Sequence, residues 1–134
     1  MRRLAALAVC VAASAVAHAD CFDEAAAYQH VNPAVLRAIA WQESHGRADA
    51  QHRNANGSVD YGLMQINSVH LGELQRWGID PSQLMRPCVG VYVAAWHLRK
   101  MMLKYGNTWD AVGAYHSETP AERARYQASI RRIV

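Results

Sequence analysis

The sequence predicts an α+β domain that is predominantly α-helical, with one small β-hairpin near its middle. Apolar residues recur at helical spacing in several segments, and N-cap residues followed by proline mark where some of these segments begin. A single Asn-Gly pair at 56–57, between short polar flanks, is typical of a hairpin turn. The chain has 134 residues, 51% of them hydrophobic and 19% charged, which fits one globular core and excludes a disordered or collagen-like chain.

The first nineteen residues have the organisation of an export signal. A positive start at 1–3 precedes an apolar stretch at 4–16, and residues 17–19 form the small-x-small pattern that signal peptidase cleaves. We therefore expect cleavage after Ala19, export, and a mature domain formed by residues 20–134. A membrane anchor is the alternative, but the apolar stretch is short for a bilayer span and no second one follows.

Export determines how the three cysteines are interpreted. Cys10 belongs to the signal, where the bulky Val9 before it disfavours lipidation. Cys21 and Cys88 remain as an even pair in an exported chain, so we expect them to form a disulfide. Closing a loop of that size stabilises the fold by about 4 kcal/mol in the loop-entropy description. Two separately buried thiols are the alternative.

Two helices are expected before the hairpin and several helical segments after it. Residues 20–30 can form a first turn or two, and Asn32, an N-cap before Pro33, opens a helix to His45 that Gly46 can terminate. The hairpin should lie between residues 53 and 61. The later segments are 68–78, a turn opened by Asp80-Pro81, 89–105, 108–115, and a last helix opened by a capping box at 119–122.

The segment 89–105 should bury one face and expose another. Its apolar positions 91, 95, 98, 102 and 105 follow helical spacing, whereas His97, Lys100 and Lys104 share a different face. Large aromatic side chains at helical spacing usually pack in the core, and we expect this of Trp41, Trp77, Trp96 and Trp109.

Glu43 is the first candidate catalytic residue. Leu36, Ile39 and Ala40 make an apolar stripe along one helical face, and Glu43 is the last member of that stripe. Burial and the negative end of the helix dipole both favour the neutral carboxyl, which raises its pKa toward the range that a proton donor needs. A carboxylate paired with a buried arginine or with backbone amides is the alternative.

Asp60 is the second candidate, because it follows the hairpin turn. A hairpin folded against the end of a helix can present Asp60 across a groove from Glu43. Two carboxyl groups on facing walls, one in apolar and one in polar surroundings, are the arrangement that glycoside hydrolysis uses. Asp60 would then stabilise or trap the oxocarbenium-like sugar, although a turn or capping role is the alternative.

Several motifs in order along the chain resemble those of the soluble lytic transglycosylase family of the lysozyme superfamily. They are Ala38-Ile39-Ala40-Trp41-Gln42-Glu43-Ser44, Gly62-Leu63-Met64-Gln65-Ile66-Asn67 and Trp109-Asp110-Ala111-Val112-Gly113-Ala114-Tyr115. Within that family the chain most resembles small exported enzymes that accompany type III, type IV and conjugation machines of Gram-negative bacteria. This resemblance implies that residues 20–134 form a catalytic domain in the periplasm.

The resemblance implies a lysozyme-like fold with the hairpin beside the substrate groove. It also implies cleavage of the β-1,4 bond between N-acetylmuramic acid (MurNAc) and N-acetylglucosamine (GlcNAc), with Glu43 as acid and then base. In that family the C6 hydroxyl of the muramic acid closes a 1,6-anhydro ring, and no metal or cofactor is implied. Components of a secretion or conjugation machine are the further partners that the resemblance suggests.

Two features depart from the family pattern. The family usually carries Ala-Tyr-Asn-Ala-Gly, whereas this chain has Tyr115-His116-Ser117-Glu118 after Ala114. The resemblance therefore carries over Tyr115, beside the acid, and leaves His116 as a weaker candidate for contacting substrate. The segment 56–68 is also similar to the hairpin of c-type lysozymes, where an aspartate stands at the position of Asp60. We interpret the site as a transglycosylase scaffold with a lysozyme-like second carboxylate.

Other residues of these motifs are candidate substrate contacts. Gln65 and Asn67 carry paired donors and acceptors suited to the N-acetyl and hydroxyl groups of a sugar, although Asn67 could equally cap the next helix. Tyr61 and Met64 can form an apolar platform under a sugar ring or pack beneath the hairpin. Ser44 can orient the acid or end its helix.

Charge and motif content exclude some classes of function. The formal net charge of +3 includes Arg2 and Arg3 of the export signal, so the mature chain carries about +1 and lacks the basic footprint of a nucleic-acid binder. A zinc peptidase is disfavoured because no His-Glu-x-x-His pair is present. A muramidase that hydrolyses the same bond, a non-catalytic peptidoglycan-binding protein and a structural secretion subunit remain as alternatives. We expect a monomer without a stable membrane anchor.

Overall fold

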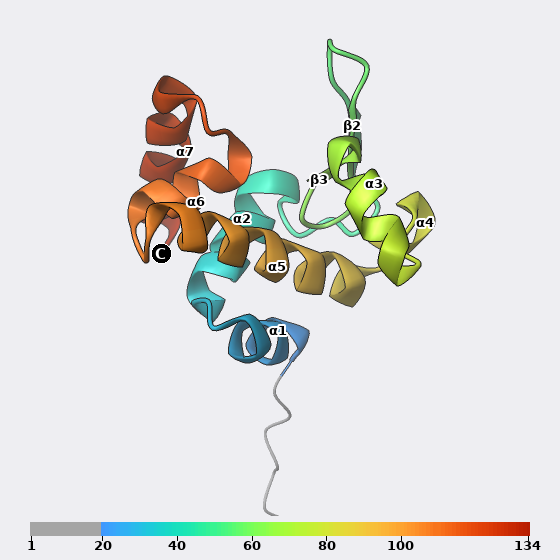
Figure 1. Ribbon diagram of the computed structural model, residues 1–134, viewed down its shortest axis with the longest axis horizontal. Coiled ribbons are helices and arrows are strands. Elements are labelled where there is room, and N and C mark those ends of the chain that lie inside the picture. Colours follow the sequence, from blue (N-terminus) through green and yellow to red (C-terminus); the bar gives the residue numbers. More distant parts are fainter. Residues whose placement is uncertain (1–19) are drawn as a thin grey trace, which may run out of the picture.

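The computed structural model describes residues 20–134, and the expected export signal lies outside these residues. A long central helix crosses the middle of the molecule, with a shorter helix beneath it, the C-terminal helices at one end and the strands near the other (Figure 1). In chain order the elements are α1 (Cys21–Gln29), α2 (Pro33–Ser44), β1 (Gln51–Arg53), β2 (Val59–Tyr61), β3 (Ile66–Asn67), η1 (Ser68–His70), α3 (Leu71–Leu74), η2 (Gln75–Trp77), α4 (Pro81–Leu84), α5 (Pro87–Tyr105), α6 (Trp109–His116) and α7 (Pro120–Ile133). The predicted predominantly α fold with a small sheet is confirmed.

The sheet contains the predicted hairpin and one further strand. β1 and β2 pair antiparallel around a tight turn in which the Gly57 amide donates to the Asn54 carbonyl at 2.9 Å. Gly57 has φ +87°, a conformation that glycine adopts at little steric cost. The third strand, β3, pairs with the other side of β2 and brings Asn67 opposite Asp60. Two residues of strand are too short to show a period in the sequence.

Helix α2 forms for the reasons the sequence suggested. The Asn32 side chain accepts a hydrogen bond from the Ala34 amide at 2.8 Å, and Pro33 occupies the first helical position. Leu36 and Ile39 are fully buried, as the apolar stripe requires. The helix ends at Ser44 because His45 takes the left-handed conformation at φ 53°, one residue before the predicted glycine.

Helix α5 begins at Pro87, two residues before the predicted start, and buries more of its surface than expected. His97 was placed on a polar face with Lys100 and Lys104, but it is only 9% exposed. Its imidazole lies under α6, where the Tyr115 carbonyl oxygen is 3.0 Å from Nε2. A backbone acceptor from another helix therefore allows a polar side chain in the interior.

The tryptophan prediction is wrong for two residues. Trp41 and Trp77 are 54% and 58% exposed, whereas Trp96 and Trp109 are partly buried against the core. Trp41 lies on the solvent side of α2, away from the apolar stripe. The predicted capping box of the last helix is also absent, because the Thr119 side chain makes no capping hydrogen bond.

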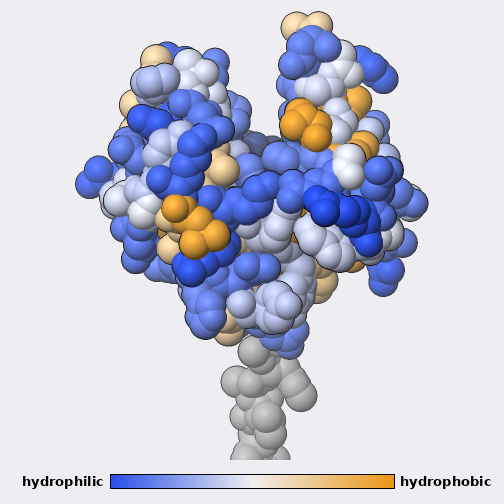
Figure 2. Space-filling view, in the orientation of Figure 1, coloured by the Kyte–Doolittle hydropathy of each residue, from blue (hydrophilic) through white to orange (hydrophobic). Residues whose placement is uncertain are grey.

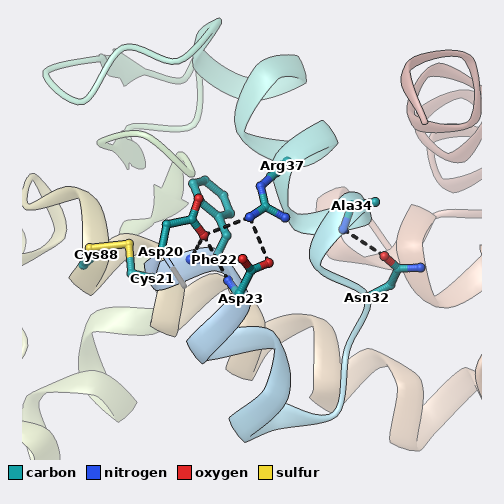
Figure 3. Close-up of polar contacts among 8 residues, drawn as sticks. All are labelled: Asp20, Cys21, Phe22, Asp23, Asn32, Ala34, Arg37 and Cys88. Atoms are coloured by element: carbon teal, nitrogen blue, oxygen red, sulfur yellow. Dashed lines mark hydrogen bonds and ion pairs between the residues drawn. A yellow bond between two sulfur atoms is a disulfide. The ribbon is translucent and has the colours of Figure 1, made fainter. Parts of the chain in front are cut away.

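The start of the described chain is fastened to the central helix. The disulfide Cys21–Cys88 joins α1 to α5, with a Cα–Cα distance of 5.7 Å. Beside it, Arg37 of α2 donates to the carboxylates of Asp20 and Asp23 at 2.8 and 2.9 Å (Figure 3). These ion pairs are exposed and contribute little stability, so the disulfide is the stronger link.

Two glycines, Gly62 and Gly113, allow other segments of the chain to pack closely against them. A Cβ on Gly62, which has φ +76°, would lie 2.3 Å from the Leu84 carbonyl oxygen. A Cβ on Gly113 of α6 would lie 2.3 Å from the Arg123 carbonyl oxygen, so this glycine lets α7 approach α6. Over residues 20–134, no helix is both long and apolar enough to cross a bilayer.

We expect replacement of both Cys21 and Cys88 by serine to lower the free energy of unfolding by about 4 kcal/mol, because the unfolded chain regains the freedom of the closed loop. The midpoint of thermal unfolding should fall by on the order of 10 °C. Calorimetry of the variant and of the native chain with and without reductant checks this. Reduction should reproduce the variant, and an unchanged midpoint would contradict the stabilising role.

Candidate active site

An open groove of about 700 Å³ lies between the strand end of the molecule and the C-terminal helices. Figure 2 shows a hollow between two lobes in this region. The groove is lined by residues from α2, the hairpin, β2, β3, α5, α6 and α7, so segments from most of the chain meet here. Both predicted catalytic carboxyl groups, Glu43 and Asp60, line it.

Glu43 lies in the last turn of α2 and is largely buried. Burial raises its pKa to about 7, and the nearby charge of Asp60 acts in the same direction. A hydrogen bond from Tyr126 opposes this rise because it favours the carboxylate. The balance keeps a substantial fraction of the carboxyl protonated near neutral pH, which a general acid requires.

Tyr126 is a functional residue that the sequence reasoning missed. Its hydroxyl, on α7, donates to Oε1 of Glu43 at 2.6 Å across 83 positions of sequence. The ring is buried, and burial and the Glu43 charge raise the pKa of the phenol well above its ordinary value, so it remains a donor. A signal was present: Tyr126 and Ile130 are one helical turn apart in an otherwise highly charged segment, and both are buried.

Asp60 lies on β2 in surroundings that contrast with those of Glu43. The Asn67 amide donates to Oδ1 of Asp60 at 2.8 Å, and the Asn54 amide donates to Oδ2 at 3.0 Å. Each carboxylate oxygen therefore has an amide donor that fixes the side chain in the groove. The two carboxyl groups occupy one apolar and one polar environment, as the sequence analysis expected.

Gln65 and Asn67 line the groove but also hold the protein together. Gln65 takes a left-handed backbone conformation at φ 50°, and its side-chain nitrogen donates to the carbonyls of Ala50 and Gly62 at 3.1 and 2.9 Å. The side-chain oxygen Oδ1 of Asn67 caps η1 by accepting a hydrogen bond from the Val69 amide at 2.9 Å. The expected capping role of Asn67 is therefore found together with its contact to Asp60.

Three predicted substrate-binding residues do not line the groove: Ser44, Tyr61 and Met64. The Ser44 hydroxyl is buried and lies 2.8 Å from the carbonyl of Leu63, so it supports the loop behind the acid. Met64 is fully buried, and Tyr61 packs against the core. Each of the three side chains therefore points into the protein, from the end of α2, from β2 and from the loop after β2.

Tyr115 and His116 flank Tyr126. Tyr115 is buried, donates its hydroxyl to the Met64 carbonyl at 2.9 Å, and stacks on Tyr126 with ring centroids 6.4 Å apart. The exposed His116 ring lies parallel to Tyr126 at 4.9 Å and lines the groove. Both residues therefore pack against the tyrosine that contacts Glu43, and both line the groove, with His116 the more exposed of the two.

His97 forms part of the groove floor together with His70. Because the Tyr115 carbonyl can only accept, Nε2 of His97 carries the proton and Nδ1 is an acceptor. Nδ1 is buried without a hydrogen-bond partner. Burial, and then the charge of His70, lower the pKa of His97 to about 4, so this floor is neutral at pH 7. Over residues 20–134, no group of three or more His, Cys, Asp and Glu side chains is arranged to hold a metal ion.

Comparison with known proteins decides the family. The family model described as Transglycosylase SLT domain matches residues 20–129, which is most of the chain. The chain belongs to this SLT transglycosylase family. Membership confirms the resemblance found in the motifs.

Curated relatives of this SLT domain come from enteric bacteria. Invasion protein IagB of Salmonella typhimurium is 44% identical over 109 residues, covering 81% of this chain and 68% of the relative. X polypeptide of Escherichia coli is 43% identical over 99 residues, with 73% and 59% covered. Protein IpgF of Shigella flexneri is 40% identical over 119 residues, with 85% and 78% covered. The chain thus spans less than two thirds of X polypeptide and somewhat more of the other two.

We expect Tyr126→Phe to raise the pKa of Glu43 by about one pH unit, because the lost hydrogen bond favours the charged carboxylate. Carboxyl-selective NMR titration of the folded protein measures this directly. Tyr105→Phe is the matched control, since the Tyr105 hydroxyl donates to Glu118 instead. An unchanged or lower pKa in Tyr126→Phe would show that this hydroxyl does not control the acid.

Glu43 should also make stability depend on pH. Its pKa is about 7 in the fold against 4.5 for the free group, so this contribution to stability is complete below pH 4.5 and is lost as pH rises through 7. The loss amounts to about 3 kcal/mol. Glu43→Gln should remove it and be the more stable protein above pH 8.

Denaturant unfolding between pH 4.5 and 8.5 measures this effect. Glu122→Gln provides the control, because it makes the same change at an exposed position in the same groove. If both glutamine variants follow the pH dependence of the native chain, the Glu43 carboxyl is not destabilised by burial.

Proposed function

We propose that this chain is a peptidoglycan lytic transglycosylase that cleaves the MurNAc-β-1,4-GlcNAc bond and forms 1,6-anhydroMurNAc. The observation that carries the proposal is the buried Glu43 carboxyl, with a pKa of about 7, in an open groove that it shares with Asp60. Membership of the SLT family supports the substrate and the reaction type.

The first step of the proposed reaction breaks the glycosidic bond. Glu43 transfers its proton to the bridging oxygen, which departs as the 4-hydroxyl of GlcNAc while positive charge develops on the muramic acid ring. Asp60, fixed by its two amide donors, stabilises that charge from the hairpin wall. The ionised Glu43 then has a hydrogen-bond donor ready in Tyr126.

The second step closes the anhydro ring. The Glu43 carboxylate takes the proton of the C6 hydroxyl as that oxygen bonds to C1 of the same sugar, and the acid is restored. No water is consumed. A muramidase-type hydrolysis, in which water attacks instead, is the second candidate function, and the presence of Asp60 in polar surroundings favours it over a purely binding protein.

We further propose that residues 1–19 direct export to the periplasm with cleavage after Ala19, where the protein acts as a monomer. There the enzyme opens the wall locally for a secretion, conjugation or pilus apparatus. The resemblance to small exported enzymes of such machines supports this role, and a relative named as an invasion protein is consistent with it. The disulfide Cys21–Cys88 fits an oxidising compartment.

The decisive experiment is mass spectrometry of muropeptides released from purified sacculi. We expect products lighter than the hydrolytic ones by one water. Glu43→Gln should reduce release at least about a thousandfold, and Asp60→Asn about a hundredfold. Asp49→Asn, an exposed aspartate outside the groove, serves as the control.

Each alternative has its own result in this assay. Reducing ends alone would replace the transglycosylase by the muramidase. Binding of sacculi without release of any fragment by the native chain would identify a non-catalytic peptidoglycan-binding protein. Release that is unchanged in Glu43→Gln would remove the acid from its proposed role.

A further inference from the structure

A second cavity lies outside the groove, among α1, η2, α4 and the first half of α5. It has a volume of about 660 Å³, which is within the range of ligand sites. Four aromatic side chains line it: Tyr28, Trp77, Tyr92 and Trp96. None of its lining residues is Asp, Glu, Lys or Arg, and the polar side chains on its wall include the carboxamides of Gln29 and Gln83.

The aromatic rings of this cavity are unusually accessible. Tyr28 is 74% exposed, Trp77 58% and Tyr92 38%. They are nevertheless ordered in pairs, with Tyr28 6.5 Å from Tyr92 and Trp77 5.7 Å from Trp96 between ring centroids. Large aromatic surface that is held in place and left open to solvent is typical of a binding site.

The cavity is also built on a rigid frame. Cys88 lines it, and the disulfide to Cys21 fixes α1 against α5, the two helices that carry Tyr28 and Tyr92. Trp96 is held from its other side by the ammonium group of Lys100, 4.2 Å from the ring centroid. Walls that do not need to be ordered on binding lose less entropy when a ligand enters.

We propose that this aromatic cavity binds a second stretch of peptidoglycan glycan, through its N-acetylated sugar rings. Pyranose rings present C–H faces that stack on aromatic rings, while N-acetyl and hydroxyl groups match carboxamides such as Gln29 and Gln83. The uncharged walls complement the GlcNAc rings of the strand, which carry no charge. They lack the cationic side chains that nucleic acids and anionic lipid headgroups require. The identity of the polymer rests on the proposed function.

The two sites share one wall, which makes the same polymer the natural occupant of both. Trp96 and His97 are neighbours on α5, and Trp96 lines the aromatic cavity while His97 lines the groove. His70, also in the groove, packs edge-on against Trp96 at 6.3 Å. The bacterial cell wall is a network of glycan strands. A glycan strand bound in the aromatic cavity therefore keeps the groove close to further glycosidic bonds that it can cleave.

Binding is tested on Glu43→Gln protein, which should leave the strands uncut. The probe is purified sacculi from which an amidase has removed the peptides. The readout is co-sedimentation at high salt, which screens the lactyl carboxylates that the amidase exposes. In this background Trp77→Ala and Tyr28→Ala should each weaken binding about two- to tenfold. Trp41→Ala is the matched control, because Trp41 is 54% exposed but lines neither cavity.

Activity provides an independent readout with Glu43 intact. Trp77→Ala and Tyr28→Ala should slow the release of fragments from insoluble sacculi by a similar factor. Their turnover of short soluble glycans, which fill only the groove, should be unchanged. Tyr28 is the more exposed of the two residues, so its variant carries the test if loss of Trp77 disturbs the fold.

The proposal is overturned if both variants bind stripped sacculi as tightly as Trp41→Ala does. That result would mean that the cavity binds no glycan, and either binds nothing or binds a protein segment. The two proposals can fail separately. Binding that depends on Trp77, in a protein whose native form releases no fragments, would refute the catalytic proposal and leave the cavity assigned. If the native chain releases fragments and both aromatic variants release them at the same rate, the catalytic proposal stands and the cavity proposal is refuted.

Discussion

The contact between the Tyr126 hydroxyl and the Glu43 carboxyl is the interaction on which the site depends. Glu43 lies at the end of α2, and the buried ring of Tyr126 on α7 contacts its carboxyl group. Covering it requires α7 to approach α6 closely, which the absence of a side chain on Gly113 permits. Once α7 is in place, the same tyrosine that helps to bury the carboxyl supplies it with one hydrogen bond. Desolvation outweighs that bond, so the acid retains its proton near neutrality, and the bond remains available to the anion after proton transfer.

The loop between β2 and β3 connects the strand that carries Asp60 to the strand that carries Asn67, without regular structure of its own. Three of its backbone carbonyls accept hydrogen bonds from side chains, two from other elements and one from the loop itself. Ser44 donates to the Leu63 carbonyl, Tyr115 to that of Met64, and Gln65 to that of Gly62. These residues were natural candidates for sugar contacts because they are polar and stand beside the acid in the motifs. Their hydrogen-bonding groups are used instead to fix the loop that carries the groove wall, as buried backbone groups demand.

Much of this fold follows from local signals in the sequence. Asn32-Pro33, Thr108 and the turn at 56–57 act over a few residues, and the elements they predict are present. The errors concern features decided by distant partners. Trp41 is exposed because no other element within residues 20–134 covers its side of α2, and His97 is buried because a carbonyl of α6 meets it. The carboxyl pair was identified from one helical face and one turn, whereas Tyr126 was not, since its role exists only when α2 and α7 are packed together. Local sequence therefore located the two proposed catalytic carboxyl groups, and tertiary packing determined which neighbours surround them.

Tyr126 lies near the C-terminus, so it is synthesised after the carboxyl group that it contacts. A ribosome delivers α2 well before α7, so a nascent chain carries Glu43 in water, where a carboxylic acid is ionised at neutral pH and has no proton to give. Part of the environment that shields Glu43, the buried ring of Tyr126, arrives only with the final helix. The protonated state of Glu43 at neutral pH is thereby coupled to completion of the fold. Any event that detaches α7 would lower the pKa of Glu43 and leave the carboxyl ionised.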